Sequence, residues 1–106
     1  MSGKIALRFA AILVAANLVL SLAVTAEPLA EAKSAYAKGD YIRAMSLFYE
    51  LAKGGNAEAE ANIGHMYLVG AGVEKNPDQA LRWYKAAALK GRASALYWVG
   101  YIYRLY

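Results

Sequence analysis

The chain of 106 residues contains no cysteine. Disulfide bonds therefore cannot hold the fold together, and the packing of side chains has to do so. A lipoprotein signal needs a cysteine just after its cleavage point, so lipid anchoring by that route is excluded. The chain also has no Asn-x-Ser/Thr sequence and thus no acceptor for N-glycosylation.

Residue types that bind metals or carry out catalysis are scarce. His65 is the single histidine, and a metal site would need further histidines, cysteines or acids at ligand spacing. We therefore expect no metal and no cofactor, and we expect His65 to lie on the surface or to line a groove. Glu58 and Glu60 stand two residues apart on a predicted helix and point to different sides. Without a convincing nucleophile or acid pair, the sequence predicts that the protein is not an enzyme.

Residues 1–26 have the layout of a secretory signal peptide. Lys4 and Arg8 give a positive start, residues 9–24 carry no charge, and small residues stand at the positions that a signal peptidase reads, which predicts cleavage after residue 26. The uncharged run has 16 residues, fewer than the roughly 20 that span a bilayer. We predict an exported protein of the bacterial periplasm or the medium that meets the membrane only transiently. The alternative is an uncleaved signal that anchors the chain in the inner membrane.

Charge argues against a nucleic-acid partner. Without residues 1–26 the chain carries ten basic and eight acidic side chains, a net charge of +2. The signs alternate along the chain, whereas a nucleic-acid binder usually shows a basic stripe. We therefore expect a protein or peptide partner and no nucleic acid.

The sequence repeats with a shift of 36 residues. The same spacing holds for the first and for the second helix of the repeating unit, which indicates a structural repeat. The pairs that this shift brings together are Ala44 with Ala80, Phe48 with Tyr84, Ala52 with Ala88, Gly55 with Gly91, Ala57 with Ala93, Ala59 with Ala95, Ile63 with Val99, Gly64 with Gly100 and Tyr67 with Tyr103.

Each unit of the repeat reads as two helices. Asn56 and Asn76 suit N-cap positions, and Pro77 suits the first position of a helix. Gly70 and Gly91 can take the left-handed conformation that ends a helix. The predicted helices cover residues 28–38, 41–53, 57–69, 77–90 and 93–105.

The repeat resembles a known family, the Sel-one-like repeats, which are related to tetratricopeptide repeats. Residues 55–91 resemble one full unit, and residues 92–106 resemble the first helix of an incomplete further unit. Residues 27–54 are similar, more loosely, to a tetratricopeptide-like hairpin. The residues that carry the resemblance of the full unit are Gly55, Ala59, Gly64, Tyr67, Gly70, Gly72, Val73, Ala80, Trp83, Tyr84, Ala87, Ala88 and Gly91. The resemblance implies an all-α fold, a short α-solenoid of about two and a half units, which scaffolds protein complexes and often occurs in exported bacterial proteins.

Two aromatic residues depart from the repeat. Trp98 and Tyr101 correspond by the shift to Asn62 and His65, which are polar, so these positions are not buried alike in both units. The first helices of successive solenoid units line the concave face. We therefore hypothesise that Asn62, His65, Trp98 and Tyr101 line a binding groove. The competing interpretation is that both aromatics fill space at the end of the stack.

The last predicted helix is unusually apolar. Residues 95–106 carry one charge, whereas the terminal unit of a repeat array normally has a polar outer face. We expect Tyr97, Tyr101 and Leu105, or their neighbours, to form an exposed apolar patch, and such patches mark interaction sites. Self-association, or stabilisation by a partner, through residues 97–106 is the prediction.

These observations favour an exported protein-interaction module that binds a peptide or a protein surface through its concave face and its apolar C-terminal helix. Two alternatives stay open. The chain is a truncated fragment of a longer repeat array without independent function, or it is a small exported domain associated with a cell-envelope enzyme. The last alternative would call for an acid–histidine pair in a pocket, and no such pair is evident in the sequence.

Overall fold

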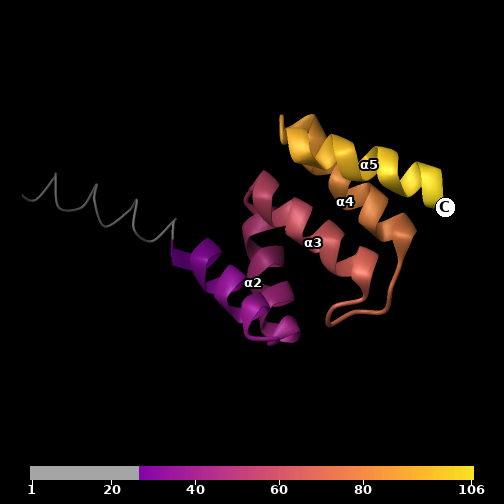
Figure 1. The fold of residues 1–106 in the computed structure, drawn as a ribbon. Coiled ribbons are helices and arrows are strands. Elements are labelled where there is room, and N and C mark those ends of the chain that lie inside the picture. Colours follow the sequence, from indigo (N-terminus) through magenta and orange to yellow (C-terminus); the bar gives the residue numbers. More distant parts are fainter. Residues whose placement is uncertain (1–26) are drawn as a thin grey trace, which may run out of the picture.

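The computed structural model describes residues 27–106, and this part of the chain is all-helical (Figure 1). The first described helix spans residues 27–37 and is here called helix 27–37. Four further helices follow it: α2 (Tyr41–Lys53), α3 (Ala57–Val69), α4 (Pro77–Leu89) and α5 (Ala93–Leu105). The five helices predicted from the sequence are confirmed, with ends that differ by one residue at most. The predicted signal segment, residues 1–26, lies outside the described residues.

Side-chain caps set where the middle helices begin. The backbone N–H of Ala59 donates to Asn56 Oδ1 at 2.9 Å, and the N–H of Gln79 donates to Asn76 Oδ1 at 3.1 Å. Each bond satisfies one of the free N–H groups at a helix start. Pro77 is the first residue of α4, where a missing N–H costs nothing. The predicted caps are confirmed.

The connection between α3 and α4 requires two glycines. Gly70 and Gly72 have φ angles of 75° and 71°, a region that residues with a Cβ rarely adopt. A Cβ on Gly72 would also lie 2.7 Å from Cβ of Tyr41. The N–H of Asn76 donates to the carbonyl of Tyr67 at 2.8 Å and closes the loop on the end of α3. The loop can therefore pack against the start of α2 because it lacks side chains there.

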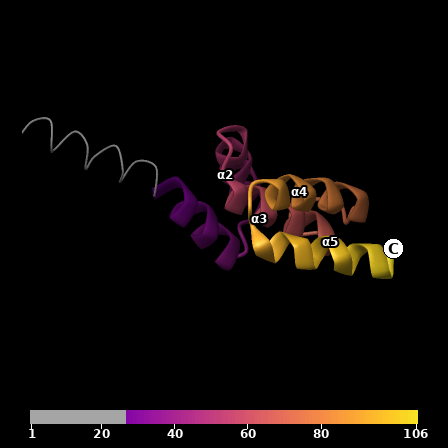
Figure 2. The same cartoon turned by 90° about the horizontal axis from the view of Figure 1, so that it is seen from above.

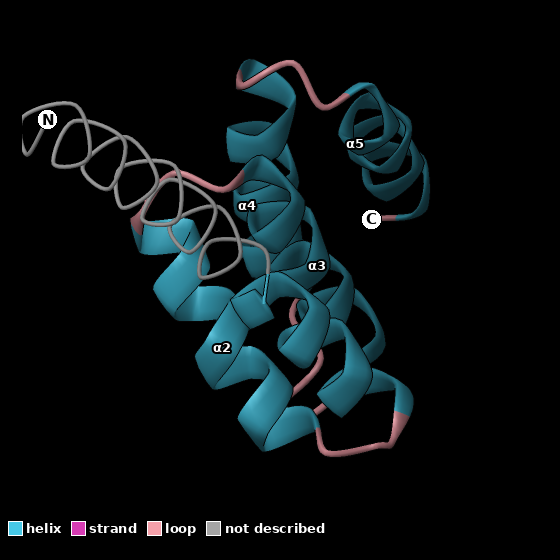
Figure 3. Ribbon diagram, turned by 90° about the vertical axis from the view of Figure 1, so that its left-hand side faces the viewer, coloured by secondary structure: helices cyan, strands magenta, loops and turns pink. Residues whose placement is uncertain are grey.

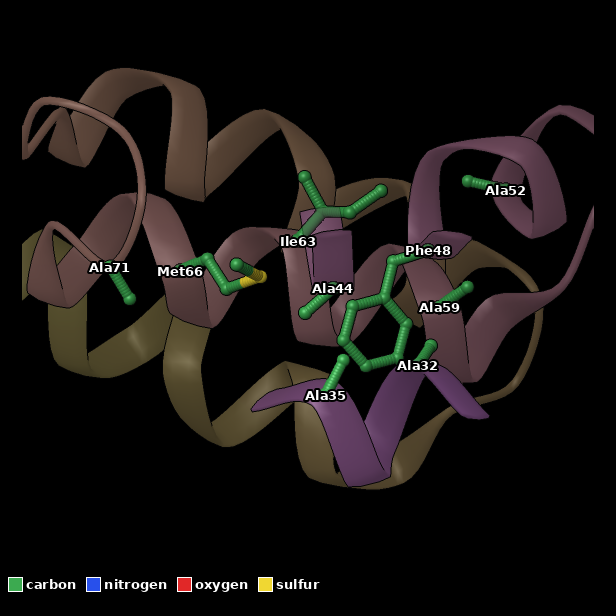
Figure 4. Packing of buried hydrophobic residues seen from close by; sticks show 9 residues of the cluster. All are labelled: Ala32, Ala35, Ala44, Phe48, Ala52, Ala59, Ile63, Met66 and Ala71. Atoms are coloured by element: carbon green, nitrogen blue, oxygen red, sulfur yellow. The ribbon is translucent and has the colours of Figure 1, made fainter. Parts of the chain in front are cut away.

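The helices form a stack in which each packs on the next: α2 on α3, α3 on α4, and α4 on α5 (Figures 1 and 2). One core cluster joins helix 27–37, α2 and α3, and its largest members are Phe48, Ile63 and Met66 (Figure 4). A second cluster joins α3, α4 and α5 around Tyr84. Because α3 contributes to both clusters, it is the central element of the stack. This arrangement is the short α-solenoid expected from the sequence.

A close crossing of α3 and α4 occurs at Gly64. Gly64 is buried, and a Cβ added there would lie 3.1 Å from the ring of Tyr84. The absent side chain lets the aromatic ring lie directly on the backbone of α3.

No helix within residues 27–106 combines the length and the apolar run needed to cross a bilayer.

Candidate functional site

A groove of about 320 Å³ lies between the first helices of three successive units. Helix 27–37, α3 and the start of α5 each contribute to its walls, and α4 adds Tyr84. The lining residues are Lys33, Glu58, Ala61, Asn62, His65, Tyr84, Arg92, Ser94 and Trp98. Three of the four residues predicted to line a groove, Asn62, His65 and Trp98, are thus brought together. Tyr101 does not reach the groove.

One side of the groove is aromatic. The ring of Trp98 stacks on that of Tyr84 with centroids 5.9 Å apart and planes inclined by 14°. The ring centroid of His65 lies 6.1 Å from that of Trp98, with the planes inclined by 63°, and 6.1 Å from that of Tyr36, with the planes inclined by 59°. Tyr84 is buried, and burial raises the pKa of its phenol well above the ordinary value, so that this group stays neutral. Trp98 therefore serves both of the roles considered above: it packs on the core cluster around Tyr84, and it faces the groove.

The other side of the groove is charged. Glu58 on α3 forms ion pairs with Lys33 on helix 27–37 and with Arg92, the residue before α5, whose Nη1 lies 3.5 Å from Glu58 Oε2. The hydrogen bond from Lys33, with the positive charges of Lys33 and Arg92, lowers the pKa of the Glu58 carboxyl and outweighs the opposing effect of burial. The first helices of all three units are thereby connected at one carboxylate.

The sequence did not reveal this charged cluster. The partners of Glu58 lie on other helices, and no local spacing links them to it. The one local signal at Glu58 is an acid near the start of a helix, which by itself indicates only a favourable charge for the helix N-terminus. Asn62 is fixed beside the cluster, since its Nδ2 donates to the carbonyl of Glu58 at 2.9 Å.

The exposed apolar patch on α5 contains two of the three predicted residues. Tyr97 and Leu105 are 60% and 57% exposed. Tyr101 is half-buried, with its ring 5.5 Å from that of Trp98 and 6.4 Å from that of Tyr97. Tyr101 is therefore not part of the exposed patch, because its ring turns toward the rings of Trp98 and Tyr97. Further exposed apolar side chains on the helix or directly after it are Leu96, Tyr103 and Tyr106.

In the described part of the chain, no group of three or more His, Cys, Asp or Glu residues is placed to hold a metal ion. The expectation that the protein has no metal or cofactor stays a prediction.

The sequence model of the Sel1 repeat matches residues 29–56, 57–91 and 93–105. The chain belongs to the Sel1 repeat family. The resemblance noted in the sequence is thereby confirmed, and the matches extend over the first hairpin as well. No curated protein and no solved structure matches the chain.

The Sel1 units coincide with the helix pairs of the structure. The first comprises helix 27–37 and α2, the second comprises α3 and α4, and α5 lies in the third match. Sel1 repeats form a protein-interaction fold that is generally not catalytic. The groove lies on the side formed by the first helices of the three Sel1 units, where a solenoid presents its binding surface.

Proposed function

We propose that this Sel1 repeat protein is an exported interaction module, and that it binds a peptide or a protein surface through the groove and through α5. The observation that carries the proposal is the gathering of Asn62, His65 and Trp98 in one groove from segments far apart in the sequence. In solenoids, such surfaces between repeats are the usual place for a ligand.

The size and chemistry of the groove favour a short segment. A volume of about 320 Å³ lies at the lower end of the range for ligand sites, roughly 300–1,000 Å³, and suits a few side chains. The exposed part of Trp98 offers an apolar contact, while Asn62 and Ser94 offer hydrogen bonds. Lys33 and Arg92 outnumber Glu58, so the charged part of the lining favours neutral or acidic ligands over basic ones.

Export is part of the proposal and is supported by the composition of residues 1–26. A positive start, an uncharged run and small residues before the cleavage point are the parts of a secretory signal. The partner is then expected among proteins of the cell envelope or the medium.

The groove is tested by selecting peptides from a displayed library on the mature protein and measuring their affinities for variants. His65→Ala and Asn62→Ala remove groove contacts with little structural cost, because His65 is half-buried and Asn62 bonds only to its own helix. We expect the double variant to lose about tenfold or more in affinity, as truncation at the centre of an interface typically does.

Ile42→Ala is the matched control, since Ile42 is exposed on α2 and does not line the groove. Peptides that bind wild type, the double variant and the control equally well would show that the groove is not the binding surface.

A further inference from the structure

The outward face of α5 carries a continuous stripe around Gly100. At helical spacing, six residues fall on this face, and all of them are exposed. They are Ala93, Leu96, Tyr97, Gly100, Tyr103 and Arg104. Gly100 lies at the centre, and a Cβ added to it would meet nothing within 4 Å. We call this surface the Gly100 stripe.

The equivalent face of α3 is covered. The 36-residue shift relates the Gly100 stripe to residues of α3 that are buried or half-buried: Ala57, Glu60, Ala61, Gly64, Tyr67 and Leu68. There α4 supplies the cover, and the ring of Tyr84 rests on Gly64. The Gly100 stripe is therefore a helix-docking face that no helix of residues 27–106 covers. The helix that carries it, α5, lies at the edge of the stack (Figures 1 and 3).

The shift also indicates what fits this face. On α3 the occupant is an amphipathic helix with an aromatic side chain over the glycine. Leu96 takes the place of Glu60, so one end of the Gly100 stripe now requires an apolar contact. Arg104 takes the place of Leu68, so the other end requires an acidic one. The two changes make the face selective for a helix with one apolar and one acidic end.

The charges around the stripe decide between partners. Lys75 Nζ lies 5.5 Å from the ring centre of Tyr106, and Lys85 Nζ lies 5.1 Å from that of Tyr103. Within residues 27–106, neither lysine nor Arg104 has an ion-pair partner, and all three are exposed. Two copies joined face to face through this stripe would bring six such cations together. An acidic helix of another protein would neutralise them.

We propose that the Gly100 stripe docks an acidic amphipathic helix of a partner protein, with an aromatic side chain seated on Gly100. The proposal deepens the proposed function by naming what α5 binds. In the hairpin of α3 and α4, the residue four positions before Tyr84 is Ala80, and it lies in the same core cluster as Leu68. The partner helix therefore runs antiparallel to α5 and carries its acid four positions before the aromatic, opposite Arg104.

The probe is a peptide with the sequence of residues 76–91 that carries Ala80→Glu and, at two exposed positions, Lys85→Glu and Lys90→Glu, so that its side chains are acidic overall. It is stapled on its outward face because short free helices are marginal in water. Its affinity for the mature protein is measured by fluorescence anisotropy. We expect binding that falls about tenfold or more with Tyr84→Ala in the peptide or with Gly100→Leu in the protein. Leucine favours a helix more than glycine does, so Gly100→Leu fills the seat without unfolding α5.

A charge exchange tests the register. Arg104→Glu should weaken the Ala80→Glu peptide, and a peptide with Ala80→Lys should recover affinity for that variant. Leu96→Ala should reduce binding, whereas Ile42→Ala, which trims an exposed aliphatic side chain on α2, should not.

The possible outcomes separate the two proposals. If the peptide does not bind, or binds Gly100→Leu as well as wild type, the docking face is overturned. The proposed groove function still stands in that case if His65→Ala and Asn62→Ala weaken the selected peptides. If sedimentation shows a dimer that Gly100→Leu disperses and the acidic peptide does not compete with it, the occupant is a second copy and the inference is wrong.

Discussion

Gly64 and Gly100 occupy the same place in successive units but touch different things. The ring of Tyr84 lies on Gly64, and a Cβ added to Gly64 would be only 3.1 Å from that ring. A Cβ added to Gly100 would have no neighbouring atom within 4 Å. A repeat in the sequence therefore does not make two glycines energetically equal. Their roles depend on which neighbouring helix is present.

Substitutions at the two glycines should change the free energy of unfolding in opposite directions. Gly64→Leu is expected to lower the free energy of unfolding by about 1–3 kcal/mol, because the side chain forces α4 away from α3. Gly100→Ala is expected to raise it by about 0.5–1 kcal/mol, since it removes a glycine from a helix interior without a clash. Circular dichroism melts of the mature protein measure both. An unchanged midpoint for Gly64→Leu would show that the crossing is looser than the structure indicates.

Glu60 is the one acid within residues 27–106 that is deeply buried, with 4% of its surface exposed. Lys90 binds its Oε1, while its Oε2 has no hydrogen-bond partner. Local spacing in the sequence does not predict this buried ion pair, because Lys90 lies 30 residues away from Glu60. Burial of a half-satisfied carboxylate is costly.

Removing Glu60 and removing Lys90 should therefore have different effects on stability. Glu60→Leu, which copies the residue at the equivalent position 96, should leave stability unchanged or raise it by about 1 kcal/mol, because Lys90 can turn to water. Lys90→Ala should lower stability by about 1–3 kcal/mol, because it leaves a buried charge without a partner. Urea denaturation of the two variants measures the difference. Equal losses would show that the pair is worth more than the burial of an apolar side chain.

Among the helices, α3 makes contacts with the largest number of other elements. It contributes to both core clusters, and at its start Glu58 joins it to helix 27–37 and to the start of α5. Because the three first helices meet at one carboxylate, the charge of Glu58 supports the shape of the groove as well as the stability of the fold.

Stability should fall in acid partly through Glu58. Its pKa is held below the ordinary value of 4.5, chiefly by the hydrogen bond from Lys33. A carboxyl with a lowered pKa in the folded state stabilises the fold fully above its unfolded pKa, and this contribution is lost as the pH falls through the folded pKa. Thermal melts from pH 7 to pH 2 should show a loss below about pH 4.5 that is smaller in Glu58→Gln. At pH 7 the same variant should be less stable than wild type. Identical profiles for both proteins would contradict the role given to this carboxylate.

On the scale of the whole molecule, the stack has two unlike ends. The exposed part of helix 27–37 carries Glu27, Glu31 and Lys33, so this end is polar. The other end carries the Gly100 stripe.

The export signal is tested on the whole chain. Mass spectrometry of the protein recovered from the periplasm or the medium should find Glu27 at the N-terminus, because residues 24–26 have the small side chains that a signal peptidase requires. An intact Met1 terminus in the membrane fraction would instead indicate an anchor.

Much of the fold followed from local patterns in the sequence. Helix starts at Asn56 and Asn76, the turn at Gly70 and the 36-residue shift all act over short distances or repeat regularly, so no tertiary information was needed. The same shift singled out Asn62, His65 and Trp98, which line one groove in the structure, whereas Tyr101, the equivalent of His65, does not.

Other features were decided only by the tertiary structure. The ion pairs of Glu58 and Glu60 join residues from different helices, and the inward turn of Tyr101 depends on the ring of Trp98 beside it. The contrast between Gly64 and Gly100 depends on whether a neighbouring helix is present. Periodicity in the sequence specifies which face of a helix is apolar, but the energy of each residue depends on what packs against that face, and this is a property of the assembled stack.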